Sequence, residues 1–256
     1  MSTRRSLAEI AHMYRAGQIL AELMAWLPTF VKPGLSTLAL DSELETLIRR
    51  QGATPAFKGY QGYPATACVS LNAEVVHGIP SANRRIQDGD IVSVDLGCVV
   101  DGYYADCATT LALGEIAEST RTLLDVTRRS LELAIDQCRV GRRLSDVSHA
   151  VQAHVEGHGL SVVRAFVGHG IGRALHEEPE VPNFGEPGRG PLLQAGMVLA
   201  IEPMVTMGAP DVDVREDGWT AVTRDGSLSA HFEHTVAITD VGPIVLTGKD
   251  GGVLRP

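Results

Sequence analysis

Similar residues recur in the two halves of this 256-residue chain at a constant offset of 107 positions. Two copies are too few for a solenoid, which needs about three repeats. We therefore expect two α+β half-domains related by a pseudo-twofold axis, which would bring Asp95 and Glu202 to the same central place. Chance similarity between two helix–turn–helix–strand units is the alternative, but the offset holds across glycines, apolar positions and a carboxylate. The matched pairs are Gly34/Gly141, Leu44/Val151, Ile48/Val155, Gly52/Gly159, Gln87/Gln194, Gly89/Gly196, Val92/Leu199, Val94/Ile201 and Asp95/Glu202.

Each half is predicted to begin with two helices. Apolar residues recur at helical spacing in the first segment, and Pro28 should end that helix. Ser36 or Thr37 can cap the second helix, and Ser145 can cap its counterpart in the second half. The predicted helices cover residues 7–27, 37–50, 115–138 and 145–157.

Residues 91–114 are typical of a β-hairpin, with Asp101-Gly102 as the turn. A turn centred just before Asp101 places Asp95 directly opposite Asp106, with Cβ atoms roughly 5 Å apart, where like charges repel. Both strands are otherwise apolar, and burial of two unpaired carboxylates is prohibitive. The two groups must share a proton or hold a cation between them. A different register would leave two ordinary surface aspartates.

The second half supplies two further carboxylates. Glu202 matches Asp95 by the offset, and Glu233 lies on the predicted return strand of the second hairpin, over residues 230–238. Four converging carboxylates require roughly two divalent cations. We therefore predict a two-metal site with metals about 3.5–4 Å apart.

A glycine-rich segment adds nitrogen to this set. His169 lies between two glycines, which allow close backbone approach, and it can bind a metal through one ring nitrogen. His176 is seven residues further on, too far for the same local turn, so we expect it to face the substrate. An oxygen-rich site with one histidine favours Mn, Fe, Co or Zn. Two such metals lower the pKa of a bridging water, so the predicted reaction class is metal-assisted hydrolysis.

Composition limits the compartment and the partners. The net charge of −9 argues against nonspecific nucleic-acid binding. No signal peptide or transmembrane span is visible, so we expect no membrane partner and a cytoplasmic location. The four cysteines form no CxxC pair and are expected to be reduced thiols: Cys68, Cys98, Cys107 and Cys138.

Asp95, Asp106, His169, Glu202 and Glu233, within the segments VSVDLG, FVGHGIGRALHEEP, VLAIEP and HFEHTVAIT, resemble the ligand set of the type I methionine aminopeptidases. The resemblance covers nearly the whole chain. It implies the α+β "pita-bread" fold, a central curved antiparallel sheet covered by helices, in two pseudo-twofold-related halves. It also implies one catalytic domain over residues 1–256, duplicated roughly as 1–114 and 115–256, without an N-terminal extension domain. The implied activity is removal of the initiator methionine from nascent polypeptides.

The resemblance assigns roles to the matching residues. It makes Asp95 a bidentate ligand of one metal, has Asp106 and Glu233 bridge both, and has His169 and Glu202 bind the other. Glu202 is also the implied general base. The implied contacts to substrate are His77 with the scissile amide or leaving amine and His176 with the carbonyl.

The same resemblance implies the substrate pocket and further partners. Three positions depart from many relatives, which carry Cys at Phe57, Phe at Leu175 and Gln at His231, and the shape of the pocket depends on them. Residues 72–74 with Ser229 resemble a site for a monovalent cation, Na or K. We expect a monomer that acts on nascent chains and binds the ribosome. We expect it to bind no specific nucleic acid. The implied pocket residues are Phe57, Tyr60, Tyr63, Cys68, Leu175 and Trp219.

Two other classes of protein compete with this interpretation. One is another pita-bread hydrolase, an Xaa-Pro aminopeptidase or prolidase, which usually has a further N-terminal domain and different histidine spacing. The other is a non-catalytic binding module on the same fold, which typically loses ligands, whereas all five positions are present here.

Overall fold

The structure is a computed structural model, and it describes residues 4–249. The helices are α1 (Leu7–Phe30), α2 (Thr37–Arg50), α3 (Glu118–Gln137) and α4 (Leu144–Gly157), with a short 3-10 turn, η1 (Tyr60–Gly62). The strands of the first half are β1 (Thr54–Pro55), β2 (Ala67–Leu71), β3 (Glu74–Val76), β4 (Ile91–Val100) and β5 (Tyr103–Ala112). Those of the second half are β6 (Ser161–Val162), β7 (Gly168–Gly170), β8 (Glu177–Val181), β9 (Val198–Ile201), β10 (Met204–Thr206), β11 (Val212–Val214), β12 (Ala221–Thr223), β13 (Ser229–His231), β14 (Glu233–Thr239) and β15 (Gly242–Val245).

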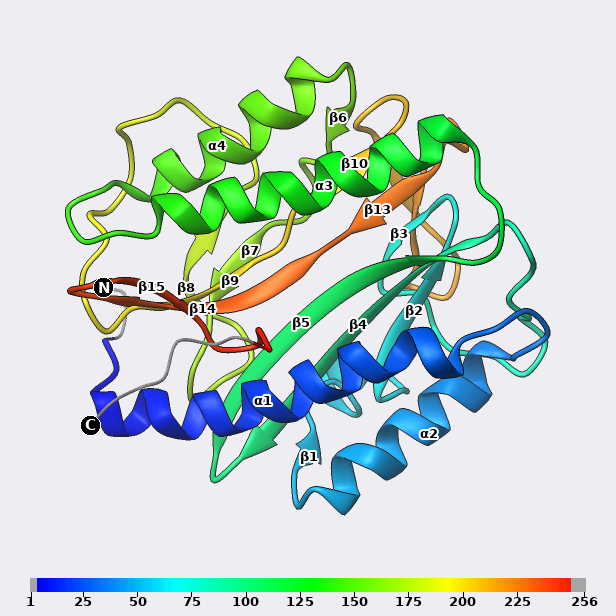
Figure 1. Ribbon diagram of the computed structural model, residues 1–256, viewed down its shortest axis with the longest axis horizontal. Coiled ribbons are helices and arrows are strands. Elements are labelled where there is room, and N and C mark those ends of the chain that lie inside the picture. The colour runs from blue at the N-terminus through cyan, green and yellow to red at the C-terminus, as the bar shows by residue number, and fades with distance from the viewer. Residues whose placement is uncertain (1–3, 250–256) are drawn as a thin grey trace.

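One large antiparallel sheet joins the two halves. Its main path is β1-β4-β5-β14-β9-β7-β8, with β2 paired to β4 and β15 paired to β14. Within this sheet the two halves meet where β5 pairs with β14. In the view of Figure 1, α1 and α2 lie toward the bottom and α3 and α4 toward the top, with β4, β5 and β14 between them. Two small sheets complete the fold, β13-β10-β6 and β11-β12-β3.

Alternation along the strands separates a helix-packed face from the opposite face of the sheet. Val92, Val94 and Leu96 of β4 share a buried core with Leu20 of α1 and Leu40 of α2. Because successive side chains in a strand point to opposite faces, the residues between them face away from these helices. In the second half, Leu199, Ile201 and Val236 pack with α3 and α4 in the same way. The carboxylates of all four strands therefore lie on the face opposite the helices.

The two halves also repeat in backbone geometry. α2 and α4 have equal lengths, and their bounds differ by the offset seen in the sequence. Gly34 and Gly141 have φ angles of +90° and +88°, and Gly89 and Gly196 have +87° and +89°. These left-handed conformations favour glycine, which accounts for the glycines of the repeat. Two isolated bridges recur at the same offset: Ser36–Arg85 and Arg143–Leu192.

The predicted helices are confirmed, with corrections at their ends. α1 continues past Pro28 to Phe30, because the proline removes only one donor and the amide of Val31 still reaches the carbonyl of Leu27 at 2.9 Å. Ser36 caps α2, with its hydroxyl accepting from the amide of Ala39. Ser145 does not cap α4. The helix begins one residue earlier, after Arg143, whose amide donates to Asp146 at 2.8 Å. α3 is shorter than predicted, by three residues at its start and one at its end.

The predicted hairpin forms as β4 and β5, but its predicted register is wrong. Asp95 stands opposite Ala108, and Asp106 stands opposite Gly97. The two-residue turn at positions 101–102 has positive φ at both residues, +52° and +78°, as the favoured tight hairpin turn requires. This turn is centred one residue later than expected, which moves each opposite partner by two positions. The two aspartates keep the same face and become diagonal neighbours.

The second hairpin differs in a similar way. The predicted return strand over residues 230–238 is broken at Phe232 into β13 and β14. Between α4 and β7, strand structure is limited to Ser161–Val162, and β7 begins only at Gly168. No helix within residues 4–249 combines the length and the apolar composition that crossing a membrane requires.

Candidate active site

The five predicted metal ligands lie on two adjacent rows across the large sheet. On one row, Asp95 of β4, Ala108 of β5 and Glu233 of β14 are successive partners. Glu202 continues this row, one residue beyond the pair Ile201–His234. The next row on the same face, two residues along the strands, carries Asp106 opposite Gly97, and His169 of β7 opposite Ala200 of β9. The sheet thus brings together residues that are far apart in the sequence.

Small residues separate the ligands within each row. Ala108 stands between Asp95 and Glu233, and Ala200 stands beside His169. At Gly97 a Cβ atom would lie 2.6 Å from the ring of Phe57, so only glycine lets this ring approach the strand. The strands therefore leave space above the sheet between the ligating side chains.

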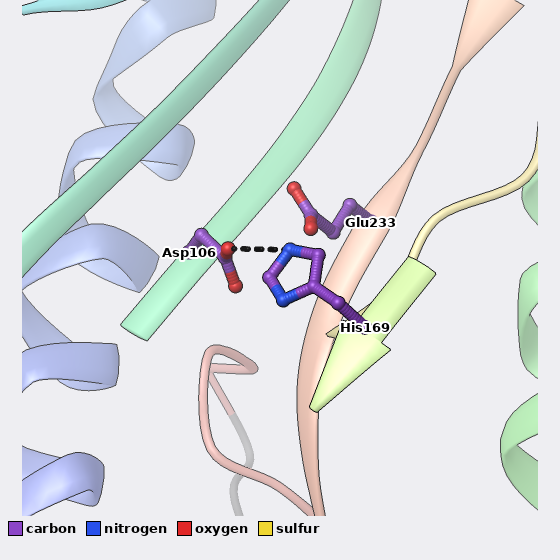
Figure 2. A group of neighbouring side chains, drawn as sticks. All are labelled: Asp106, His169 and Glu233. Carbon is purple, nitrogen blue, oxygen red and sulfur yellow. Dashed lines mark ion pairs between the residues drawn. The ribbon is translucent and has the colours of Figure 1, made fainter. Parts of the chain in front are cut away.

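The tightest group is Asp106, His169 and Glu233, which each offer a ligand atom within 4.8 Å of the others. Figure 2 shows these side chains, from β5, β7 and β14, pointing toward one another. Nε2 of His169 lies 3.4 Å from Asp106 and 3.5 Å from Glu202. Its Nδ1 lies 2.9 Å from the carbonyl of Gly170, a contact that fixes the ring and leaves Nε2 toward the carboxylates.

The electrostatics of this group show an excess of buried negative charge. Burial, and then the charge of Asp106, raise the pKa of Asp95 well above its ordinary range, and the same two causes raise the pKa of Glu233. Burial raises the pKa of Glu202 to about 8, against the opposing charge of His169. Burial lowers the pKa of His169, but its contacts with Asp106 and the charge of Glu202 outweigh this and raise it to about 9.

The donor set fits divalent cations. Oδ1 of Asp95 is buried without a hydrogen-bond partner, as is Nε2 of His231, which lies 3.8 Å from Glu202. An orphaned buried carboxylate oxygen requires an explanation, and a cation bound by Asp95 supplies it. Asp95, Asp106, His169, Glu202 and Glu233 are mainly oxygen donors with one imidazole, a set suited to Mn, Fe, Co or Zn.

His176 lies closer to the metal ligands than its spacing in the sequence suggested. Its ring contacts that of His169, with centroids 4.2 Å apart, although we expected the two on separate turns. The reversal from β7 into β8, with a register shift after His169, brings the chain back. Burial lowers the pKa of His176 to about 4, so the ring is neutral at neutral pH. Its Nδ1 lies 2.8 Å from the hydroxyl of Tyr60.

His77 occupies the other wall of the site. It has a φ of +60°, a conformation that residues other than glycine rarely adopt. Its ring packs edge-on against Phe166, with centroids 5.3 Å apart, and burial lowers its pKa. The strained backbone aims the imidazole into the same cavity as His176.

All thirteen predicted site residues line one cavity of about 320 Å³. Its apolar part is formed by the predicted pocket residues, among which Tyr63, Cys68 and Leu175 are buried. Trp219 closes this part and packs edge-on against Tyr63 at 5.1 Å. The carboxylates and the three histidines form the other part, so an apolar pocket opens directly onto the candidate metal centre.

Sequence reasoning missed several residues of the site. Thr235 lies beside Asp106: the amide of Asp106 donates to its hydroxyl at 3.0 Å, and the hydroxyl contacts Oδ1 at 2.9 Å. Its position two residues after Glu233, on the same face of a strand, was a signal that could have found it. Phe166 is the first residue of the segment FVGHGIGRALHEEP that contains His169. The other lining residues that were missed are Gln61, Val76, Ala165 and Val167.

A curved antiparallel sheet that gathers carboxylates and an imidazole beside an apolar pocket defines a metal-dependent hydrolase. The sequence profile of metallopeptidase family M24 matches residues 11–240. The chain is 51% identical over 239 residues to methionine aminopeptidase of Clostridium acetobutylicum, an alignment that covers 93% of this chain and 96% of that relative. It is 48% identical to methionine aminopeptidase 1 of Bacillus subtilis over the same shares of both chains. The crystal structure of methionine aminopeptidase from Thermotoga maritima superposes with a TM-score of 0.96 at 46% identity, covering 97% of this chain and all of that one.

The chain belongs to metallopeptidase family M24, and within it to the methionine aminopeptidases. Its fold is the pita-bread fold of that family, as predicted. Prolidase from Pyrococcus furiosus shares the fold at 22% identity, with a TM-score of 0.79, and this chain covers 66% of its length. That likeness concerns the fold alone.

Proposed function

We propose that this protein removes N-terminal methionine from polypeptides by metal-assisted peptide hydrolysis. The observation that carries the proposal is one cavity holding five ligand side chains beside an apolar pocket. The pocket contains aromatic rings and the polarizable sulfur of Cys68, which suit a thioether side chain. The relatives at about half identity, which are named methionine aminopeptidases, support the same conclusion.

The proposed roles follow the positions of the side chains. Asp95 would hold one cation, and His169 with Glu202 the other, while Asp106 and Glu233 would bridge both. Bound divalent metals would lower the pKa of a water nucleophile and polarise the scissile carbonyl.

The protein's own groups would move the protons. Glu202 would accept the proton of the attacking water, because its carboxylate faces the ligand cluster. If the hydroxyl of Tyr60 donates to Nδ1 of His176, the neutral ring carries its proton on Nε2 and can donate it to the developing oxyanion. His77, on the opposite wall, would contact the amide or the leaving amine.

Further proposals concern the other partners. The carbonyl of Asn72 accepts from the amide of Ser229 at 2.9 Å, so it retains a lone pair for a Na or K ion. We propose one catalytic unit over residues 1–256, duplicated roughly as 1–114 and 115–256, and the matched φ angles of the repeat support it. We also propose a cytoplasmic monomer that acts on nascent chains at the ribosome. Light scattering and cosedimentation with ribosomes test these two statements.

One comparison of substrates tests the function. The protein is freed of metal with a chelator, reloaded separately with Mn, Fe, Co or Zn, and given a Met-Ala-Ser peptide and an Xaa-Pro peptide. We expect metal-dependent release of methionine from the first peptide only. Cleavage of the Xaa-Pro peptide alone would indicate a prolidase, and inactivity with every metal would indicate a binding module on this fold.

A further inference from the structure

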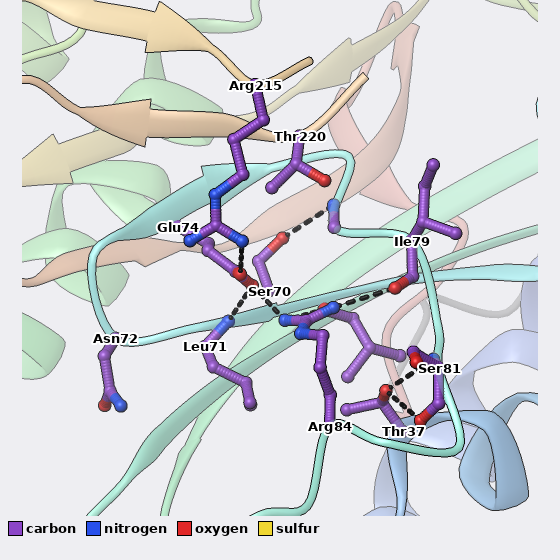
Figure 3. Close-up of polar contacts among 12 residues, drawn as sticks. Thr37, Ser70, Leu71, Asn72, Glu74, Ile79, Ser81, Arg84, Arg215 and Thr220 are labelled. Atoms are coloured by element: carbon purple, nitrogen blue, oxygen red, sulfur yellow. Dashed lines mark hydrogen bonds and ion pairs between the residues drawn. The ribbon is translucent and has the colours of Figure 1, made fainter. Parts of the chain in front are cut away.

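Glu74 is a buried carboxylate outside the proposed metal centre, and it is bound by two arginines. Its side chain is 5% exposed, forms an ion pair with Arg84 and accepts from Arg215 at 2.7 Å. It also accepts from the amide of Leu71 at 2.8 Å. Figure 3 shows the two guanidinium groups meeting at this carboxylate from different parts of the chain. A buried carboxylate is costly unless it is paired, so a two-arginine site of this kind holds its members firmly.

Arg84 connects this carboxylate to the backbone that follows His77. Its guanidinium donates to the carbonyl of Ile79 at 2.8 Å and to that of Val69 at 3.3 Å. Arg84 therefore ties the segment after His77 to the neighbouring strand β2, while Glu74 lies three residues before His77 in β3.

The strained conformation of His77 needs such support. A non-glycine residue at φ +60° persists only where the surrounding structure fixes it. The amide of Gly78 donates to Ser70 at 3.1 Å, and the hydroxyl of Tyr63 donates to the carbonyl of Gly78 at 3.1 Å. The backbone directly after His77 is thus held at both its amide and its carbonyl group.

Arg215 connects the same carboxylate to Trp219, whose ring is a neighbour of the His77 ring in the wall of the pocket. Arg215 follows β11, and its amide donates to the carbonyl of Thr220 at 2.9 Å, closing the turn that carries Trp219. The Trp219 ring lies edge-on to Tyr63 at 5.1 Å and to His77 at 6.2 Å. The Arg215 side chain is 50% exposed, so it can be replaced without opening the core.

We propose that Glu74, Arg84 and Arg215 form a positioning network that fixes His77 and Trp219 relative to each other in the wall of the substrate pocket. Arg84 holds the His77 side, and Arg215 holds the Trp219 turn. Arg215 thereby determines how firmly the first side chain of the substrate is held. The consequence for substrate rests on the proposed function, whereas the position of Trp219 can be measured without substrate.

The chain offers a matched control for Arg215. Arg224 lies at the other end of the β11–β12 hairpin and pairs with Asp213 at 2.9 Å, with both side chains exposed. Arg224→Gln removes the same charge from the same hairpin but leaves Glu74 untouched. The only other tryptophan is Trp26 on α1, so Trp26→Phe makes Trp219 the sole tryptophan fluorophore.

The first measurement is acrylamide quenching of Trp219 in the Trp26→Phe background, without substrate. We expect Arg215→Gln to increase the quenching constant roughly twofold, because the turn opens locally, and Arg224→Gln to leave it unchanged. Arg215→Lys should restore most of the protection. Equal quenching in the Arg215→Gln and Arg224→Gln variants would overturn the network.

The second measurement is steady-state kinetics with a Met-Ala-Ser peptide and saturating metal. Arg215→Gln should raise KM about fivefold and change kcat by less than about twofold, because it loosens uniform binding. Glu74→Gln weakens the contacts with both Arg84 and Arg215. It should therefore also lower kcat, by about tenfold, because His77 loses its position. A kcat loss without a KM change in Arg215→Gln would refute the assigned role. If the parent protein shows no peptidase activity, the quenching result still decides whether the network positions Trp219.

Discussion

Metal binding to the proposed centre should release at least about two protons at pH 7. Two of them come from Glu202, whose pKa is raised to about 8, and His169, whose pKa is raised to about 9. Both hold a proton at pH 7 in the metal-free protein, and both must lose it to become ligands. The apparent affinity for metal should therefore rise roughly a hundredfold per pH unit near neutrality.

The same shifts set the sign of the pH dependence of metal-free stability. For Glu202 the folded pKa of about 8 exceeds the ordinary value of 4.5, so a stability penalty appears above pH 4.5 and grows until pH 8. For His169 the folded pKa of about 9 exceeds the ordinary value of 6.5, so its stabilisation is complete below pH 6.5 and is lost as pH rises through 9. Both groups therefore make the metal-free protein less stable as the pH rises. Each excess proton contributes about 1.4 kcal/mol per pH unit, so between pH 6.5 and 8 the free energy of unfolding should fall by up to about 2.7 kcal/mol per unit.

Two assays measure these quantities. Titration calorimetry with Mn at pH 7, in two buffers of different ionisation enthalpy, gives the number of protons released. Urea unfolding of the metal-free and metal-loaded protein at pH 6.5 and pH 8 gives the stability slopes, and the metal-loaded slope should be much flatter. Release of less than about half a proton, or metal-free stability that does not fall with pH, would refute the electrostatic reasoning.

Three substitutions test other parts of the site. Asp106→Ala should abolish both metal loading and activity, because it removes a proposed bridging ligand; undiminished metal in elemental analysis would contradict that assignment. His176→Ala should lower turnover about a hundredfold or more while metal stays bound, as removal of an oxyanion donor does, and loss of metal would instead make His176 a ligand. Gly97→Ala should destabilise the protein by about 1–3 kcal/mol in urea unfolding and raise KM, because its Cβ would displace the ring of Phe57; unchanged stability and KM would mean that this contact does not shape the pocket.

Much of the site was accessible from local sequence patterns. The repeat predicted two equivalent halves, and the φ angles of paired glycines now explain why those glycines recur. The Asp101-Gly102 turn predicted a hairpin with both aspartates on one face. The offset linked Glu202 to Asp95, the glycine-rich segment indicated His169 and His176, and resemblance to a known family supplied His77.

The errors came from quantities that local patterns do not contain. Hairpin register depends on which residues adopt positive φ, and a change of one residue in the turn centre changed the partner of Asp95 from Asp106 to Ala108. The distance between His169 and His176 depends on a chain reversal with a register shift, so seven intervening positions said little about it.

The sequence by itself determined the main elements and the repeat, and it predicted the ligands, because these follow from periodicity, turn chemistry and motif. Only the tertiary structure decided the two rows of the sheet on which the ligands converge. Only the tertiary structure revealed that Glu74 forms ion pairs with Arg84 and Arg215. Such contacts join segments that share no local signal, and they form because burial of a carboxylate requires partners that only the folded chain can bring together.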